Sequence, residues 1–215
     1  MRIISGTLKG RVLTPPKSFA AHPTTDYAKE GLFNILENSL DLSAVSVLDL
    51  FSGSGNIAFE FASRGCPSVV CVEMDPAYAR FISKTAESFG VADRVRVVRN
   101  NVFDFLNICT SRFHIVFADP PYDLPGLELL PQKIMQADIL GPAADTPATD
   151  AIEPTAGAIE ATAGANNEGL IVLEHPAAYS FSNTPSFQKT RKYGHVHFSF
   201  FAVSKTLPTF ALPNK

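Results

Sequence analysis

The most specific run in the chain is Asp119-Pro120-Pro121-Tyr122, which follows the apolar segment Phe113–Ala118. Two prolines cannot extend a sheet and have no N–H to donate, so they would hold the chain rigid here. The Asp119 carboxylate and the Pro120 carbonyl could each accept one N–H of an exocyclic amino group on a base. The Tyr122 ring could stack on that base, which is worth about 1–3 kcal/mol. A structural Pro-Pro turn with a solvated Asp is the alternative interpretation.

A second candidate site is the glycine turn Asp49–Gly55, of sequence Asp-Leu-Phe-Ser-Gly-Ser-Gly. The glycines let the backbone turn tightly and let a ligand approach closely. The helix expected next would offer free N–H groups to an anion. Glu73 ends a later apolar run, Ser68–Glu73, where a carboxylate can accept from both hydroxyls of a ribose. These features predict a nucleotide cofactor, with a tight turn that binds nothing as the alternative.

Both NAD proteins and S-adenosylmethionine (SAM) proteins show this glycine pattern with an acid near its end. Asp49 separates the two, because an acid four residues before Gly53 suits the methionine ammonium of SAM but would repel a pyrophosphate. No separate substrate domain of dehydrogenase type follows. We therefore expect SAM, with its methyl sulfonium beside the amine held at Asp119 and with proximity as the main source of catalysis. An NAD-binding protein is the alternative.

The elements that must position these residues alternate along the chain. Strands are predicted at Val45–Leu50, Ser68–Glu73, Val95–Arg99, Phe113–Ala118 and Leu170–Glu174. Helices are predicted after Gly55 and at Pro76–Phe89, Phe103–Ile108 and Leu127–Ala137. This alternation predicts an α/β fold with a doubly wound, mostly parallel seven-stranded sheet. A C-terminal hairpin, Phe187–Tyr193 with Val196–Val203, would add an antiparallel element at one edge.

Two further segments complete the expected organisation. Short β runs at Arg2–Ile4 and Arg11–Thr14 predict a basic β-hairpin arm over residues 1–22, ahead of a main domain over residues 23–215. Pro23-Thr24-Thr25-Asp26 is a helix-start signal. Residues 142–167 are rich in Ala, Thr, Asp and Pro and lack periodicity, which predicts an inserted surface loop.

Composition limits the partners. The 215 residues are 46% hydrophobic, and no apolar run approaches a membrane span. Three cysteines without CxxC spacing suit a reducing cytosol, so we expect a cytoplasmic protein. The net charge is −3, yet residues 1–29 carry five basic side chains against one acid, and residues 189–215 carry five against none. Basic ends on an acidic body fit a protein that grips a polyanion locally. Ends that are merely solvated are the alternative.

Asp49–Gly55, Glu73 and Asp119–Tyr122 together resemble the pattern of class I SAM-dependent methyltransferases that act on amino nitrogens. Two N-terminal blocks are similar to one family of that class, the RsmD family, which methylates N2 of a guanine in 16S rRNA. These blocks are Met1–Gly6 with Lys9-Gly10-Arg11, and Pro23–Asp26 with Glu30–Leu36. Further matches are Ser63-Arg64-Gly65, Glu174-His175 and Arg191–Gly194. Apart from residues 142–167, the resemblance covers nearly the whole chain.

The resemblance implies a Rossmann-like fold, SAM as cofactor, and 16S rRNA or an assembling small subunit as partner of a monomer, with no metal and no membrane. Residues implied to hold SAM are Asp49, Phe51, Ser52, Gly53, Gly55, Glu73, Met74, Asn101 and Val102. The reacting base must leave its stack. The residues implied to hold it are Asp119, Pro120, Pro121 and Tyr122. Those implied to contact RNA are Arg2, Lys9, Arg11, His22, Thr24, Thr25, Lys29, Arg191 and Lys192.

Three departures from the family pattern stand out. His22 occupies the place of an Arg before the Pro-Thr-Thr-Asp run, and Tyr27 or Lys29 the place of another Arg. Asn100-Asn101 replaces a Gly-Asp whose acid contacts the adenine amino group. The Asn101 side-chain carbonyl could still accept that hydrogen bond, without charge. The alternatives left open are N6-adenine methylation of DNA, N5-glutamine methylation of a protein, and a non-catalytic RNA-binding relative.

Overall fold

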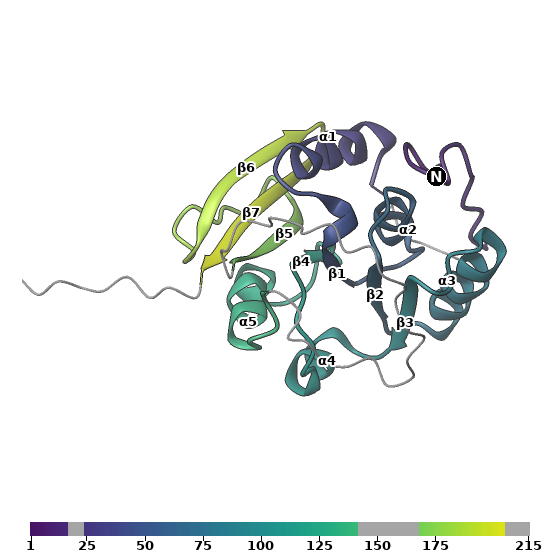
Figure 1. Ribbon diagram of the computed structural model, residues 1–215. Coiled ribbons are helices and arrows are strands. Elements are labelled where there is room, and N and C mark those ends of the chain that lie inside the picture. The colour runs from purple at the N-terminus through teal and green to yellow at the C-terminus, as the bar shows by residue number, and fades with distance from the viewer. Residues whose placement is uncertain (17–23, 142–167, 205–215) are drawn as a thin grey trace, which may run out of the picture.

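The computed structural model describes residues 1–16, 24–141 and 168–204, which build one seven-stranded sheet with helices on both faces (Figure 1). His22 and the predicted insertion at residues 142–167 lie outside the described residues. In chain order the elements are α1 (Asp26–Glu37), η1 (Leu42–Ala44), β1 (Ser46–Leu50), α2 (Asn56–Ser63), β2 (Ser68–Glu73), α3 (Pro76–Phe89), β3 (Val95–Arg99), α4 (Val102–Ile108), β4 (Ile115–Ala118), η2 (Leu127–Leu129), α5 (Leu130–Gln136), β5 (Glu168–Pro176), β6 (Phe187–Tyr193) and β7 (Val196–Ser204).

The sheet is mixed, with the strand order β3-β2-β1-β4-β5-β7-β6. The first five strands of this order pair in parallel, whereas β7 pairs antiparallel with both β5 and β6. This corrects the expectation of a mostly parallel sheet. The reason is the C-terminal hairpin: strands joined by a tight turn must run antiparallel, and β7 pairs with the whole nine-residue length of β5.

Each face of the sheet has its own apolar core. Helices α1, α2 and α3 contribute Phe33, Phe59 and Ile82 to one cluster, while α4 and α5 contribute Leu106 and Ile134 to the other. The central strands are buried on both faces, as expected of parallel strands covered by helices. No helix in the described part of the chain is long and apolar enough to cross a membrane.

The expected N-terminal β-hairpin is not confirmed as a pair of regular strands. Within residues 1–16, Arg2 and Val12 make one isolated antiparallel bridge, flanked by hydrogen bonds from the Ile3 N–H to the Arg11 carbonyl at 2.9 Å and from the Leu13 N–H to the Met1 carbonyl at 3.0 Å. The segment packs its backbone onto α2: the Thr7 N–H donates to the Ser63 carbonyl at 2.7 Å. Gly6, at φ 79°, comes so close that an added Cβ would lie 1.9 Å from the Ser63 carbonyl oxygen. The basic N-terminal segment is therefore part of the main core rather than a free arm.

Lys29 is fully buried between α1, α2 and the N-terminal segment. Its ammonium donates to the Arg2 carbonyl at 2.6 Å and to Asn56 Oδ1 at 2.9 Å, and it pairs with Glu60 Oε2 at 3.1 Å. Burial lowers the pKa of Lys29, and the Glu60 carboxylate opposes that shift. The expectation that Lys29 contacts RNA is therefore wrong: its charge is used inside the fold.

Glu60 is the buried counterpart of Lys29. Its carboxylate accepts from the Ile4 N–H at 2.8 Å and from the Ser5 N–H at 3.0 Å. It also pairs with Arg64, one turn further along α2, at 2.9 Å. One carboxylate thus neutralises two cations and satisfies two backbone donors, which fixes the N-terminal segment to α1 and α2.

Lys29→Met should destabilise the protein by about 3 kcal/mol, because removing one partner of a buried ion pair leaves the other charge without full compensation. The control is Lys84→Met on the exposed face of α3, which should change stability by less than about 0.5 kcal/mol. Urea unfolding of both variants measures the difference. Equal unfolding midpoints would show that the Lys29–Glu60 pair does not hold the N-terminal segment in place.

Candidate active site

Four acidic side chains stand at one edge of the sheet, where β2, β1, β4 and β5 end: Glu73, Asp49, Asp119 and Glu174. The register places Leu50 beside Val72 and Ala118, and Ala118 beside Leu173. Asp119 and Glu174, which follow Ala118 and Leu173, are therefore neighbours. The carboxyl ends of parallel strands are where open α/β sheets bind ligands.

The glycine turn between β1 and α2 has the expected tight geometry. Phe51, Gly53 and Gly55 all have positive φ, at 60°, 52° and 74°. A Cβ on Gly55 would lie 3.0 Å from the Phe59 ring, so this position requires glycine on two counts. A Cβ on Gly53 would meet nothing nearer than 3.9 Å. The Ser52 hydroxyl donates to the Asp49 carbonyl at 2.6 Å, which fixes the turn and leaves open space beside Gly53.

Glu73 ties the glycine turn to the end of β2. Its carboxylate accepts from the Gly53 N–H and from the Asp75 N–H, both at 2.8 Å. Burial raises the pKa of Glu73, and the two backbone N–H groups oppose that shift. Each carboxylate oxygen has further acceptor capacity, so Glu73 could also receive the two hydroxyls of a ribose.

Asp49 is 2% exposed, and its Oδ2 has no hydrogen-bond partner among the described residues. Burial raises the pKa of Asp49 to about 8, and the nearby charge of Glu73 adds to the shift. A buried acceptor without a partner is unusual, and an ammonium group would supply both the donor and the opposite charge. The glycine turn, Glu73 and Asp49 therefore fit SAM as a cofactor.

The predicted adenine contacts lie where β2 and β3 end. Asn101 caps the N-terminus of α4, where its Oδ1 accepts from the Phe103 N–H at 2.8 Å. Its amide nitrogen lies 3.8 Å from the sulfur of Met74, which is 65% exposed. Val102 is buried, and Phe51 packs edge-on against Phe103. Asn101 and Met74 thus lie close together where β2 and β3 end, and an adenine there stays a prediction.

The Asp119 corner directly follows β4. Pro120 is buried, whereas Pro121 is exposed and the Tyr122 side chain is 45% exposed. Asp119 is partly buried, and burial raises its pKa well above the ordinary value. The charges of Glu174 and Asp49 raise it further. The carboxylate of Asp119 therefore lies near those of Asp49 and Glu174, at a proline-rich corner next to the exposed Tyr122.

Glu174 is the residue at this site that sequence reasoning did not include. It is 2% exposed, and its Oε2 accepts from the Thr24 hydroxyl at 2.7 Å. It also forms a hydrogen bond with the Tyr122 hydroxyl. Burial raises the pKa of Glu174 to about 7, and these two hydrogen bonds limit the shift. The sequence signal that could have identified Glu174 is its position as an acid at the end of a predicted apolar strand, as at Asp119.

Thr24 is 5% exposed and uses its hydroxyl inside the fold. This corrects the expectation that it contacts RNA. The next residue, Thr25, is exposed and caps α1 by accepting from the Ala28 N–H at 3.2 Å. Thr24 also accepts at its carbonyl from the Asn56 amide at 3.4 Å. Within the described residues, Thr25 and Asp26 therefore start a helix, as predicted, and Thr24 supports Glu174.

His175 points away from this cluster. Its Nε2 lies 2.8 Å from the Ser199 hydroxyl and its Nδ1 lies 3.0 Å from the Pro176 carbonyl. Burial lowers the pKa of His175. These contacts agree with a structural role. In the described part of the chain, no group of three or more His, Cys, Asp or Glu side chains is placed to hold a metal ion.

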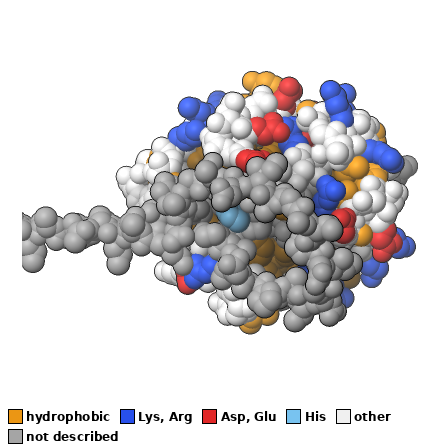
Figure 2. Space-filling model, in the orientation of Figure 1, with side chains coloured by type: hydrophobic (Ala, Val, Ile, Leu, Met, Phe, Trp, Pro, Cys, Tyr) orange, Lys and Arg blue, Asp and Glu red, His pale blue; other side chains and the backbone are white. Residues whose placement is uncertain are grey.

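The other residues predicted to contact RNA are exposed wherever the structure describes them: Arg2, Lys9, Arg11, Arg191 and Lys192. Arg2 pairs with Asp26 at 2.8 Å, and Arg11 lies over the Phe89 ring at 5.4 Å. Figure 2 shows Lys and Arg side chains along the side of the molecule where Figure 1 places the N-terminal segment and α3. Their contact with RNA stays a prediction.

Known proteins resemble this chain both in sequence and in fold. A family model described as "Conserved hypothetical protein 95" matches residues 1–145. The Escherichia coli (strain K12) protein named Ribosomal RNA small subunit methyltransferase D is 37% identical over 122 residues. That alignment covers 57% of this chain and 60% of the relative, so the chain matches about three fifths of that enzyme's length.

Two solved structures share the fold. The Escherichia coli protein yhhF has a TM-score of 0.72 and 27% identity, with 94% of this chain and 97% of that chain covered. An RNA methyltransferase from Salinibacter ruber, in complex with S-adenosyl-L-homocysteine, has a TM-score of 0.58 and 17% identity over 87% of this chain and 97% of that chain. Fold and site together define a class I SAM-dependent methyltransferase. Within that class, the chain belongs to the RsmD family.

Because Asp49 has a pKa of about 8 when no ligand is bound, SAM binding should release about one proton per site at pH 6.5. The ammonium of SAM favours the ionised carboxylate, so the proton must leave. Calorimetric titration with SAM in two buffers of different ionisation enthalpy measures this release. In Asp49→Asn the release should vanish and binding should weaken by about 100-fold or more. Proton release in that variant would assign the effect to another group.

Glu174 gives the protein a second pH dependence. Its pKa in the folded state, about 7, lies above the ordinary carboxyl value, so stability is lost as pH rises from about 4.5 to about 7. Glu174→Gln cannot ionise, so its unfolding free energy should fall less between pH 5 and pH 8, by on the order of 1–3 kcal/mol. Urea unfolding across this pH range, with exposed Glu128→Gln as control, tests it. A Glu174→Gln curve parallel to wild type would contradict a raised pKa.

Proposed function

We propose that this methyltransferase transfers a methyl group from SAM to the exocyclic N2 of a guanine in 16S rRNA of the small ribosomal subunit. The observation that carries the proposal is the Asp119-Pro120 corner next to the buried Asp49, whose Oδ2 has no hydrogen-bond partner among the described residues. The name of the 37% identical relative supports rRNA as the substrate class. The exposed N-terminal cations support a polyanionic substrate. Action as a monomer in the cytoplasm belongs to the same proposal.

The roles of the protein groups follow from their positions. SAM, when bound, supplies a methyl group on a positively charged sulfur. Asp49 holds the cofactor's ammonium, and Glu73 holds its ribose. The Asp119 carboxylate and the Pro120 carbonyl each accept one N–H of the guanine amine, which leaves its nitrogen lone pair free to take the methyl group. The methylated nitrogen then loses one proton to water. The Tyr122 ring, 45% exposed, provides the stacking face for the extruded base.

The N–H donors of a bound base would also lower the pKa of Asp119 from its raised value in the ligand-free site. In the ligand-free site, burial and the charges of Glu174 and Asp49 all favour a protonated Asp119. Two N–H donors of a bound base and a positive charge nearby favour the ionised form instead. Asp119 therefore becomes a full acceptor when both ligands are in place, and orientation of the amine is then the main contribution to rate.

Asp119→Ala should reduce methyl transfer to 16S rRNA by about 1,000-fold or more, since the amine loses an acceptor that orients it. SAM binding should stay within a few-fold of wild type. The matched control is Asp123→Ala, an exposed acid in the same loop. Transfer of labelled methyl to 16S rRNA and to small subunits from cells that lack the enzyme measures the effect. Near-full activity of Asp119→Ala would contradict the role of Asp119 in holding the amine.

The product identifies the acceptor atom. Mass spectrometry of nucleosides from the labelled rRNA should show N2-methylguanosine. N6-methyladenosine would contradict the assigned base, and methylglutamine in a protein fraction would contradict the substrate class. Calorimetric binding of SAM without transfer to either form of rRNA would favour a non-catalytic RNA-binding protein.

A further inference from the structure

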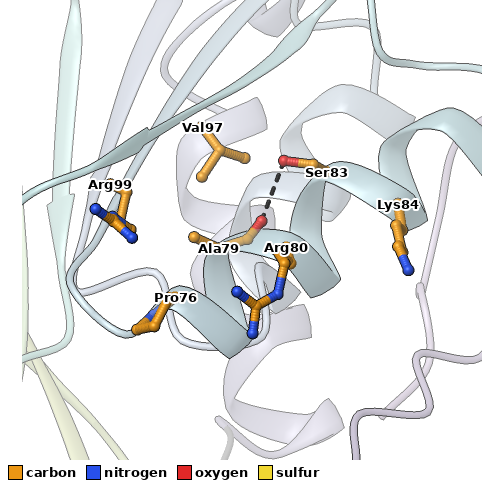
Figure 3. A pocket seen from close by; sticks show the side chains of 7 residues that line it. All are labelled: Pro76, Ala79, Arg80, Ser83, Lys84, Val97 and Arg99. Carbon is orange, nitrogen blue, oxygen red and sulfur yellow. Dashed lines mark hydrogen bonds between the residues drawn. The ribbon is translucent and has the colours of Figure 1, made fainter.

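A groove of about 370 Å³ lies between α3 and the edge strand β3, outside the site described above. Its floor is aliphatic, formed by Pro76, Ala79 and Val97. Figure 3 shows Val97 directed toward α3, the guanidinium groups of Arg99 and Arg80 on either side of Pro76, and Lys84 further along the helix. Three cations therefore border one shallow apolar floor.

The secondary structure itself collects these cations on one face. Arg80 and Lys84 are four residues apart on α3, so their side chains share a helix face. Val97 and Arg99 are two residues apart on β3, so they share the sheet face that α3 covers. Arg96, by the same alternation, points to the opposite face.

The local charge contrasts with that of the chain. Residues 76–99 contain five basic and two acidic side chains, although the whole chain carries a net charge of −3. Arg80, Lys84 and Arg99 are exposed, and none of them makes an ion pair with another described residue. Glu87 lies three residues from Lys84 on α3 but does not pair with it. The three cations of the groove thus stay exposed without an ion pair, although Glu73 is the register partner of Arg99 on the next strand.

The groove also reaches the edge of the sheet that carries Asp119. Arg99 is the last residue of β3, at the same sheet edge as Asp119. The strands β4 and β3 are separated by three strand spacings, roughly 14 Å. At the other end of α3, the Arg11 guanidinium lies 5.4 Å from the centre of the Phe89 ring. The basic N-terminal segment therefore contacts the same helix that lines the groove.

We propose that this groove binds the phosphodiester backbone of the rRNA that flanks the target base. The inference rests on the proposed function and extends its RNA-contacting surface to α3 and β3. Exposed, unpaired guanidinium and ammonium groups are the usual partners of phosphates. The open floor has no aromatic ring for stacking, which favours a backbone over a bound nucleotide. An edge strand can also carry cations only to prevent sheet-to-sheet association, and the experiment separates these roles.

The test compares Arg80→Gln/Arg99→Gln with the matched control Arg94→Gln/Arg96→Gln. Both variants remove two charges from the same segment, but only the first removes them from the groove. Binding to unmethylated 16S rRNA is measured by filter retention between about 50 and 200 mM KCl. We expect the groove variant to bind about 10-fold more weakly and its log–log salt slope to fall by about 1.5, at about 0.7–0.9 for each lost phosphate contact. The control should behave as wild type.

Arg80→Lys/Arg99→Lys retains both charges and should keep the wild-type salt slope. SAM affinity, measured on every variant, reports folding of the adjoining cofactor site and should not change. Equal RNA affinity and slope for the two glutamine variants would overturn the proposal and leave edge protection as the role of these cations. That result would not affect the proposed function, which fails instead if the wild-type protein transfers no methyl group to 16S rRNA.

Discussion

The concentration of acidic side chains at one sheet edge is the constraint on which the site depends. Burial raises the pKa of Asp49, Glu73, Asp119 and Glu174 together. Backbone N–H groups satisfy Glu73, and hydroxyls from Thr24 and Tyr122 satisfy Glu174. Asp49 keeps an oxygen without a partner, and every influence on Asp119 raises its pKa. The two carboxylates that the fold leaves uncompensated are those assigned to the cofactor ammonium and the substrate amine.

Buried polar contacts connect this edge to the rest of the domain. Thr24 donates to Glu174 and accepts from Asn56, and Asn56 in turn accepts from Lys29. Asn56 is the first residue of α2, directly after the glycine turn. The start of α1, the start of α2 and the end of β5 are therefore held by one set of hydrogen bonds. This network fixes Glu174 relative to the start of α2, since buried polar groups tolerate little loss of a partner.

Local patterns predicted most elements because strands here are short apolar runs and helices begin at capping residues. Asp75, for example, accepts from the Ala77 N–H at the start of α3 as its sequence position suggests. Long-range partners were not predictable. The residues around Lys29 predict an exposed lysine on an amphipathic helix. Its burial depends on the ion pair with Glu60, which lies thirty-one residues later in the chain. The pairing of Arg2 with Val12 was predictable from the two short apolar runs, but the packing of Ile3, Leu8 and Leu13 into the main core was not.

The order of the strands also decides where a polyanion can approach. Acidic side chains lie at or near the ends of β2, β1, β4 and β5, and burial raises the pKa of each, so the centre of this edge offers phosphates no attraction. At the end of β3 the sign changes, because Arg99 and the neutral Asn100-Asn101 stand where an acid would complete the row. Exposed cations then continue across α3 to the N-terminal segment. A centre without exposed cations and a positive border agree with the proposed arrangement, in which the RNA backbone stays at the rim and the base is turned inward.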